Sequence, residues 1–384
     1  MLATAGDKPM EQRATQPFET IEIMRPLLPQ AGDILPYLER IDRTRWYSNF
    51  GPLEQELRGR LAEHFGVTAE HTITASSATS GLIAVLRALN LPKSSYCLVP
   101  SWTFVASPAA AIAAEMTPYF IDINETTWAL DPEAVKKQIT QIDGVIGAVL
   151  VVAPFGKPVD IAAWDKFTAE TSIPVVVDAA SGFDSFRHAA FGKTAVTFSL
   201  HATKVLGVGE GAVVVSNDTA LLRHVHEQTN FGYYTRRISI PGINSKMSEY
   251  TAAVAHAALD TWPARRAQWV ATTELCQRAL TPVAQKHDLT LWFPEDAVTT
   301  TCNIRLPTLT ADKVISQLQV RGIKARQWWD KGCHMQPAYA RYPHGDLSVT
   351  EKLGLSVVSL PFYVDIPARH LAAVAAALDD VLSQ

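Results

Sequence analysis

The sequence lacks the features of disulfide-bonded, zinc-binding and membrane-spanning proteins. Its cysteines show no Cys-x-x-Cys spacing; they are Cys97, Cys276, Cys302 and Cys333. A disulfide framework or a zinc site is therefore not expected, and we predict no metal site. The stretch with the fewest polar residues, 105–114, is far shorter than the ~20 residues that a membrane span needs.

The sequence also lacks an excess of charge of either sign. It has 34 Lys and Arg against 38 Asp and Glu, a net charge of −4, so nothing indicates a nucleic-acid partner. The N-terminal residues are polar and lack the apolar segment of a signal peptide, so we expect a cytoplasmic protein with no membrane partner. With 47% apolar and 19% charged residues, the chain has the composition of a folded protein rather than a disordered one.

The length and the order of elements predict two folded domains after a flexible N-terminal arm over residues 1–20. Residues 21–262 alternate between helical patterns and short apolar runs, which is typical of an α/β domain with a mainly parallel sheet. The expected strands are 72–75, 96–99, 118–121, 148–152, 174–177, 196–200 and 212–215. Residues 263–384 combine long helical patterns, such as 264–287, with separated strands and predict a smaller C-terminal α+β domain.

A possible phosphate site follows the first expected strand, where small and hydroxyl residues lead into a helix. The amides at the N-terminus of a helix favour an anion, and Ser77, Ala78, Thr79 and Ser80 stand at this position. Ordinary capping of the helix by Ser or Thr is the alternative explanation.

Two strand ends carry residues that suit cofactor chemistry. Asp178 ends an apolar strand, where a buried carboxylate needs a donor or a cation such as a protonated heterocyclic nitrogen. Lys204 follows another strand in a glycine-rich loop, where a lysine in apolar surroundings can lose its proton and form a Schiff base. A capping aspartate and a solvent-facing loop lysine are the alternatives.

The order of these features favours one interpretation. A pyridoxal phosphate (PLP) site needs four parts, and the sequence has them in order: a phosphate-binding helix start, the aromatic segment 100–107, a strand-end acid and a strand-end lysine 26 residues later (204 − 178). The acid would hold the ring nitrogen protonated, so that the cofactor withdraws electrons from the substrate carbon.

From about residue 46 to 365 the chain resembles the DegT-type family of sugar aminotransferases, which are PLP-dependent transferases of fold type I. The resemblance rests on several motifs in the family's order, which are SNFGPLEQEL, SATSGLIAVLRAL, VPSWTFVAS, IPVVVDAASG, FSLHATKVLGVGEGAVVVSND, PGINSKMSEYTAA, CHMQPAY and VSLPF. It implies a large mainly parallel-sheet domain with a smaller C-terminal α+β domain.

The resemblance also implies roles for individual residues. Lys204 would form the Schiff base and move the proton, and Asp178 would pair with the ring nitrogen. Phe104, rather than Trp102, matches the aromatic residue that stacks on the ring. The other matched positions are phosphate ligands at Ala78, Thr79 and Ser199, a phosphate contact to the other subunit's cofactor at Asn244, and a sugar-pocket residue at His334, for which a structural histidine is the alternative.

Four positions depart from the family's pattern; one of them is Ala212, because the family's glycine pair after the lysine loop is Gly211-Ala212 here. Ala78 replaces a glycine, which requires a negative φ at this residue. Ser181 replaces a longer Gln or His that would reach the cofactor's phenolic oxygen, and Lys246 replaces an arginine with its bidentate guanidinium. These changes are expected to affect the detailed geometry of the site and the choice of substrate, and to leave the cofactor chemistry intact.

Together these residues predict a homodimeric PLP-dependent aminotransferase that moves an amino group, with glutamate as the implied donor, to a nucleotide-linked keto-sugar. One branch of the family, in which histidine replaces the lysine, catalyses dehydration instead, and Lys204 favours transamination. An aminotransferase of a cyclitol or other cyclic ketone remains open, as does a PLP-binding regulatory protein without turnover.

Overall fold

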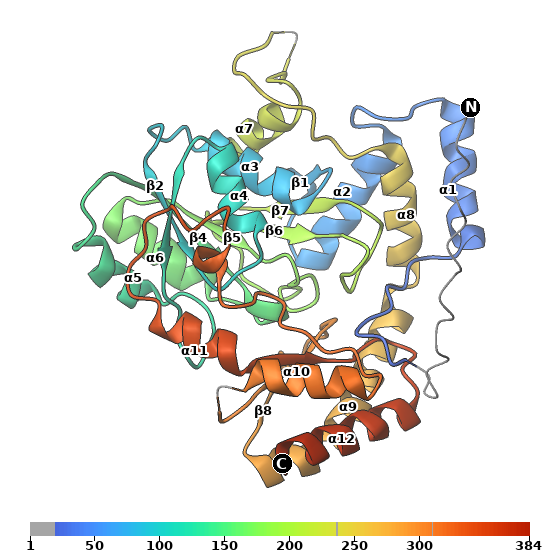
Figure 1. Ribbon diagram of the computed structural model, residues 1–384. Helices are drawn as coiled ribbons and strands as arrows, with labels where there is room; N and C mark the ends of the chain where they lie inside the picture. Colours follow the sequence, from blue (N-terminus) through green and yellow to red (C-terminus); the bar gives the residue numbers. More distant parts are fainter. Residues whose placement is uncertain (1–19, 236, 309) are drawn as a thin grey trace, which may run out of the picture.

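A sheet of seven strands runs through the computed structural model, which describes residues 20–235, 237–308 and 310–384 (Figure 1). The strand order is β1-β7-β6-β5-β4-β2-β3, and β7 runs in the opposite direction to the other six strands. The strands are β1 (Thr72–Ala75), β2 (Tyr96–Pro100), β3 (Thr117–Ile121), β4 (Ile146–Val152), β5 (Val175–Asp178), β6 (Ala195–Ser199) and β7 (Ala212–Val215). The predicted α/β class with a mainly parallel sheet is confirmed.

Both faces of this sheet are covered by helices, which explains the continuous apolar runs of the strands. One face packs against α3 (Ala78–Ala88), α4 (Ala106–Ala113) and α7 (Thr219–Thr229). The other packs against α2 (Pro52–Phe65), α5 (Pro132–Ile139), α6 (Ile161–Thr171) and α8 (Glu249–Asp260). Successive residues of β4 alternate between the two cores, with Leu150 in the first and Val149 and Val151 in the second.

Helix α3 lies unusually close to the sheet at Gly81. A Cβ at this glycine would lie 3.2 Å from Thr197 Cγ2 in β6 and 3.3 Å from Val214 Cγ2 in β7. The absent side chain therefore lets the start of α3 approach β6 and β7, the strands on either side of the loop that carries Lys204.

The C-terminal part forms a second, smaller sheet below the first in Figure 1. Its order is β10-β9-β8, all antiparallel, and α12 packs against α9 and α10. The elements are α9 (Trp262–His287), β8 (Thr290–Trp292), β9 (Cys302–Arg305), α10 (Ala311–Val320), α11 (Ser348–Ser356), β10 (Val357–Leu360) and α12 (Ala368–Leu382). The domain boundaries given above stay predictions.

Helix α1 (Ala31–Thr44) packs along α8. The expected arm over residues 1–20 falls, apart from residue 20, outside the described residues. No helix in the described part of the chain is both long and apolar enough for a membrane span.

A buried carboxyl group, Glu54, lies between α2 and β1. The side chain of Glu249 accepts the N–H groups of Leu53 and Glu54 at 2.9 and 2.8 Å and so caps α2 from α8. Glu54 Oε1 accepts a hydrogen bond from Thr74, but within the described residues its Oε2 has no partner. Burial raises the pKa of Glu54; Thr74 and Arg58 oppose this rise, and Glu249 adds to it.

We expect Glu54→Gln to stabilise the protein at alkaline pH and to change little at acidic pH. Because the folded-state pKa of Glu54 is raised, its neutral form contributes stability that is complete below the unfolded-state pKa and is lost as the pH rises through the folded-state pKa. Urea unfolding at pH 5 and pH 8 should give the variant an advantage of roughly 1–3 kcal/mol at pH 8 only. The exposed Glu63→Gln on the same helix is the control and should follow the wild type; an equal advantage at both pH values would contradict the prediction.

Candidate functional site

The sheet topology brings most of the predicted site residues to one edge. Strands β2 to β6 are mutually parallel, and β1 runs in the same direction because β7 is antiparallel to both β1 and β6. Their carboxyl ends therefore meet at the edge where open α/β sheets bind ligands. The residues at this edge are Ala78 and Thr79 after β1, Phe104 after β2, Asp178 at the end of β5, Ser199 at the end of β6 and Lys204 in the following loop.

Lys204 contacts the loop that follows β5. Its Nζ donates a hydrogen bond to Ser181 Oγ at 2.9 Å, and its main-chain N–H donates to His201 O at 2.8 Å. Although the side chain as a whole is only half-buried, protein atoms surround the amine, and this burial lowers its pKa, while the nearby Asp178 opposes the shift. A lysine with a lowered pKa is suited to nucleophilic and proton-transfer chemistry near neutral pH.

Asp178 is a buried carboxylate whose partners are mostly neutral. Ser107 Oγ donates to Oδ2 at 2.8 Å and the Ala180 N–H donates to Oδ1 at 3.1 Å. Burial raises the pKa of Asp178, and these two hydrogen bonds and the Lys204 charge lower it only in part. The site would therefore gain from a further cation beside Asp178, which a protonated ring nitrogen provides.

The start of α3 combines an ordinary cap with free amides. Ser77 Oγ accepts from the Ser80 N–H at 3.2 Å, and Ser80 Oγ accepts from the Ser77 N–H at 3.1 Å, which is a capping box. Within the described residues the N–H groups of Ala78 and Thr79 have no acceptor. The predicted capping alternative is therefore present, but it leaves two amides of the helix start without an acceptor. These two free amides fit a phosphate. The helical Ala78 has a negative φ, so alanine replaces the family's glycine without backbone strain.

The aromatic segment after β2 separates into a buried and an exposed ring. Trp102 is 3% exposed and lies edge-on against Trp128, Phe155 and Trp329. Phe104 is 60% exposed. Of these two residues Phe104 is therefore the more accessible, and its role as the ring-stacking residue stays a prediction.

Ser199 and Asn244 lie close to the other elements of the site. Ser199 Oγ is buried and accepts a hydrogen bond from the His201 N–H at 3.2 Å. Asn244 is exposed, and the next residue, Ser245, accepts the Ser76 N–H at 2.7 Å, beside the start of α3. The roles of both residues, including the contact from Asn244 to a second subunit, stay predictions.

The side chain of His334 is buried rather than accessible to solvent. Its ring is 8% exposed, with Nδ1 2.7 Å from Ser101 Oγ and Nε2 3.5 Å from Glu351 Oε1. Burial lowers the pKa of His334, and Glu351 opposes the shift. This environment favours the structural alternative; the predicted sugar contact is not tested by it.

Two residues next to the predicted site residues, Ser107 and Gly156, were not predicted from the sequence. Ser107, the partner of Asp178, stands one helical turn after Thr103, and their hydroxyl oxygens lie 3.0 Å apart. This spacing of two hydroxyl residues at the start of a helix was the only signal for it. Gly156 was missed as well, although a Cβ there would lie 3.0 Å from Ser181 O.

Comparisons with known proteins extend the resemblance seen in the motifs. Residues 30–379 match the model of the DegT/DnrJ/EryC1/StrS aminotransferase family. Protein Rv3402c of Mycobacterium tuberculosis H37Rv is 31% identical over 94% of this chain and 90% of its own length. GDP-perosamine synthase of Caulobacter vibrioides CB 15 is 28% identical over 90% of this chain and 94% of its own length.

A solved structure shares the whole fold. The crystal structure of DesI in the presence of its TDP-sugar product superposes with a TM-score of 0.85 at 28% identity, covering 96% of this chain and 94% of that one. The family match and this structural similarity confirm the resemblance and the predicted fold type I architecture.

Proposed function

Because the chain belongs to the DegT/DnrJ/EryC1/StrS aminotransferase family, we propose that it is a PLP-dependent aminotransferase that transfers an amino group from glutamate to a nucleotide-linked keto-sugar. The observation that carries this proposal is the convergence of Lys204, Asp178 and the free amides of α3 at one sheet edge. Bound PLP supplies an electron-withdrawing ring that makes the substrate's carbon–hydrogen bond acidic.

The lysine is proposed to carry the cofactor and the proton. Burial lowers the pKa of Lys204, so a larger fraction of its amine is neutral and can accept a proton than for an exposed lysine. Ser181 Oγ, 2.9 Å from Nζ, fixes the direction of the amine. Proton transfer between two carbon atoms requires this kind of fixed, deprotonated amine near both.

The other residues bind and orient the cofactor. Asp178 would hold the ring nitrogen in its protonated form, and Ser107 and the Ala180 N–H keep the carboxylate in place. The amides of Ala78 and Thr79, with Ser199, would hold the phosphate at the positive end of α3. Phe104 would cover one face of the ring.

The substrate class rests on the relatives. One is named GDP-perosamine synthase, and DesI was crystallised with a TDP-sugar product, so a nucleotide-linked sugar is the proposed acceptor. The matching nucleoside diphosphate should then compete with the acceptor, whereas an enzyme for a cyclitol would not be inhibited by any nucleotide.

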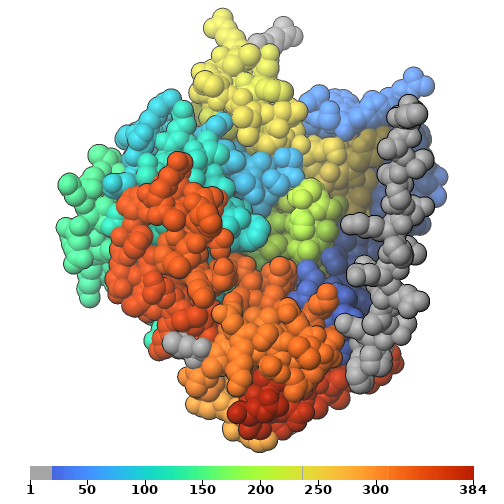
Figure 2. Space-filling model, viewed as in Figure 1, coloured from blue at the N-terminus to red at the C-terminus, as the bar shows by residue number. Residues whose placement is uncertain are grey.

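A second copy of the chain is proposed to complete the site. Residues 230–235 and 237–244 form a hairpin that projects from the body at the top of Figures 1 and 2. Exposed apolar side chains cover it and the surface beside it, namely Trp46, Tyr47, Phe231, Tyr233, Tyr234, Ile238 and Tyr250. Ring contacts connect this surface, from Phe50 to His226 at 4.3 Å and from His226 to Tyr234 at 6.1 Å. An exposed apolar patch of this kind is typical of a protein interface, and Asn244 stands at the base of the hairpin.

The absorption spectrum tests the cofactor and the donor together. Purified protein with added PLP should show a visible band that glutamate bleaches, because the amino group passes to the cofactor. A band that resists glutamate would mean another donor or a regulatory protein without turnover. Absence of any bound PLP would refute the proposed function.

A further inference from the structure

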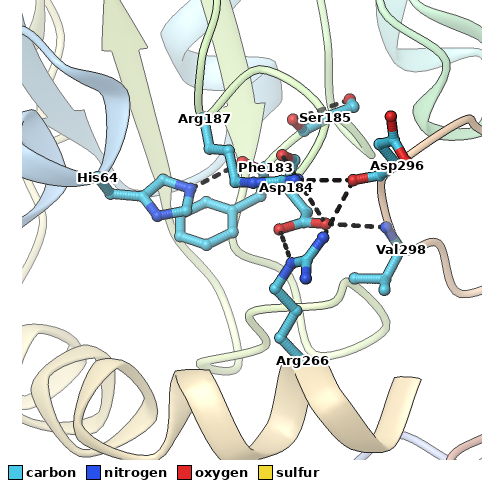
Figure 3. Close-up of polar contacts among 9 residues, drawn as sticks. His64, Phe183, Asp184, Ser185, Arg187, Arg266, Asp296 and Val298 are labelled. Atoms are coloured by element: carbon cyan, nitrogen blue, oxygen red, sulfur yellow. Dashed lines mark hydrogen bonds and ion pairs between the residues drawn. The ribbon is translucent and has the colours of Figure 1, made fainter. Parts of the chain in front are cut away.

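Asp184, six residues after Asp178, is the centre of a buried polar cluster (Figure 3). Its side chain is fully buried and accepts hydrogen bonds from Arg266 Nε at 2.8 Å, Arg187 Nη1 at 3.1 Å and the Val298 N–H at 2.9 Å. A buried carboxylate with two guanidinium partners and an amide is held in a single position, because a shift would break charge-assisted hydrogen bonds away from water.

The two arginines also bind the segment 296–299, which leads towards β9. Arg187 Nη2 and Arg266 Nη2 donate to Asp296 O at 2.8 and 3.0 Å, as Figure 3 shows. Together with the contact from Val298 to Asp184, these bonds attach the 296–299 segment to the loop 179–187, which follows β5.

The last residue of the 296–299 segment reaches a second loop, which follows β4. Thr299 Oγ1 donates to Phe155 O at 2.9 Å. Phe155 and Gly156 have φ values of 50° and 91°, a left-handed turn that is costly for a bulky side chain and needs support from its surroundings. The Phe155 ring stacks on Trp329 with the centroids 4.0 Å apart, which provides further support.

Ser181 belongs to the loop 179–187 and is contacted by the loop that follows β4. The turn at Gly156 lies against Ser181 O, where a Cβ would come within 3.0 Å. Beyond Ser181, Phe183 O accepts a hydrogen bond from His64 Nε2 at 2.9 Å, and the two rings stack with centroids 4.0 Å apart. The position of Ser181 is therefore set from both sides by packed groups.

We propose that Asp184 and Thr299 are positioning residues for Lys204: through the 296–299 segment they hold the loops 154–157 and 179–187 so that Ser181 Oγ stays within hydrogen-bond distance of Lys204 Nζ. The importance of Lys204 rests on the proposed function. The contact itself can be measured in protein without cofactor, so the two ideas can fail separately.

The experiment measures the pH dependence of acetylation of Lys204 by acetic anhydride in the cofactor-free protein, read by peptide mass spectrometry. The midpoint of the titration gives the pKa of the Lys204 amine, and the plateau rate at high pH measures how accessible the amine is to the reagent. The variants are Ser181→Ala, Thr299→Val, Asp184→Asn and the double variant of Ser181→Ala with Thr299→Val. The matched control is Asp379→Asn on α12, a carboxylate that likewise accepts hydrogen bonds from two side chains, those of Lys286 and His287.

We expect the midpoint to move down in Ser181→Ala and in Thr299→Val, because the ammonium form of Lys204 loses an acceptor. In the Ser181→Ala background Thr299→Val should add no further shift, since it acts through Ser181. Asp184→Asn should shift the midpoint in the same direction. If this variant does not fold, the midpoint of Thr299→Val tests the proposal by itself. The control should keep the wild-type midpoint.

Three results would overturn the proposal. The first is a wild-type midpoint in folded Thr299→Val or Ser181→Ala. The second is an upward shift of the midpoint in Thr299→Val, which would indicate that water enters the site. The third is a midpoint in the double variant that is lower than in Ser181→Ala by the full shift of Thr299→Val. Failure of the proposed function would appear instead as absence of PLP binding and would leave these midpoints in place.

Discussion

Lys204→Ala should abolish transamination, with kcat at least about 10⁴-fold lower, because it removes both the proposed attachment point of the cofactor and the proposed proton carrier. Steady-state turnover with glutamate and a nucleotide-linked keto-sugar measures the loss. Lys286→Ala, which removes a surface lysine bound to Asp379, is the control and should keep full activity. Turnover by Lys204→Ala within tenfold of the wild type would exclude the proposed mechanism.

The same variant tests whether two subunits share a site. If Asn244 acts on the partner's cofactor, Asn244→Ala and Lys204→Ala are both inactive alone, but a mixed dimer keeps one site with both residues intact. Random pairing of equal amounts would then restore activity to about a quarter of the sites. No recovery after dissociation and mixing, with mixed dimers shown to be present, would mean that the site belongs to one chain.

Asp178→Asn is expected to lower kcat by about 10²–10³-fold and to weaken PLP binding, the second largest effect. An amide at this position cannot hold the ring nitrogen in its protonated form, so the charge that develops at the substrate carbon loses its stabilisation. Turnover and a PLP titration by absorbance measure the two effects.

Ser107→Ala is the graded control for this prediction. It removes one hydrogen bond to the Asp178 carboxylate and keeps the charge. We expect a loss of about tenfold, the size of one hydrogen bond to a charged group. Equal effects of Ser107→Ala and Asp178→Asn would show that the geometry of the carboxylate matters, and not its charge.

The sequence allowed the sheet and the principal site residues to be predicted. Strands buried on both faces are continuous apolar runs, and such runs can be located without knowledge of the fold. Because these strands are parallel, a polar residue at the end of one is brought to the same edge as a polar residue at the end of another. Asp178 and Lys204 could be predicted to share one site for this reason.

Residues that act through packing were not predictable in the same way. Ser107 meets Asp178 from 71 positions away in the chain, and Val298 meets Asp184 from 114 positions away. No periodic pattern in the sequence predicts such pairs, because the distance between the two residues of a pair depends on how α4 and the 296–299 segment pack against the sheet.

The sequence by itself determined the α/β class and the common edge of the strand ends, and it predicted that Lys204 and Asp178 belong to one site. The tertiary structure alone decided which groups surround them. It buried Trp102 and exposed Phe104, left the amides of Ala78 and Thr79 free beside a capping box, and enclosed His334. The physical reason is that strand position follows from local hydrophobic pattern, whereas burial, hydrogen-bond partners and pKa shifts follow from contacts between segments far apart in the chain.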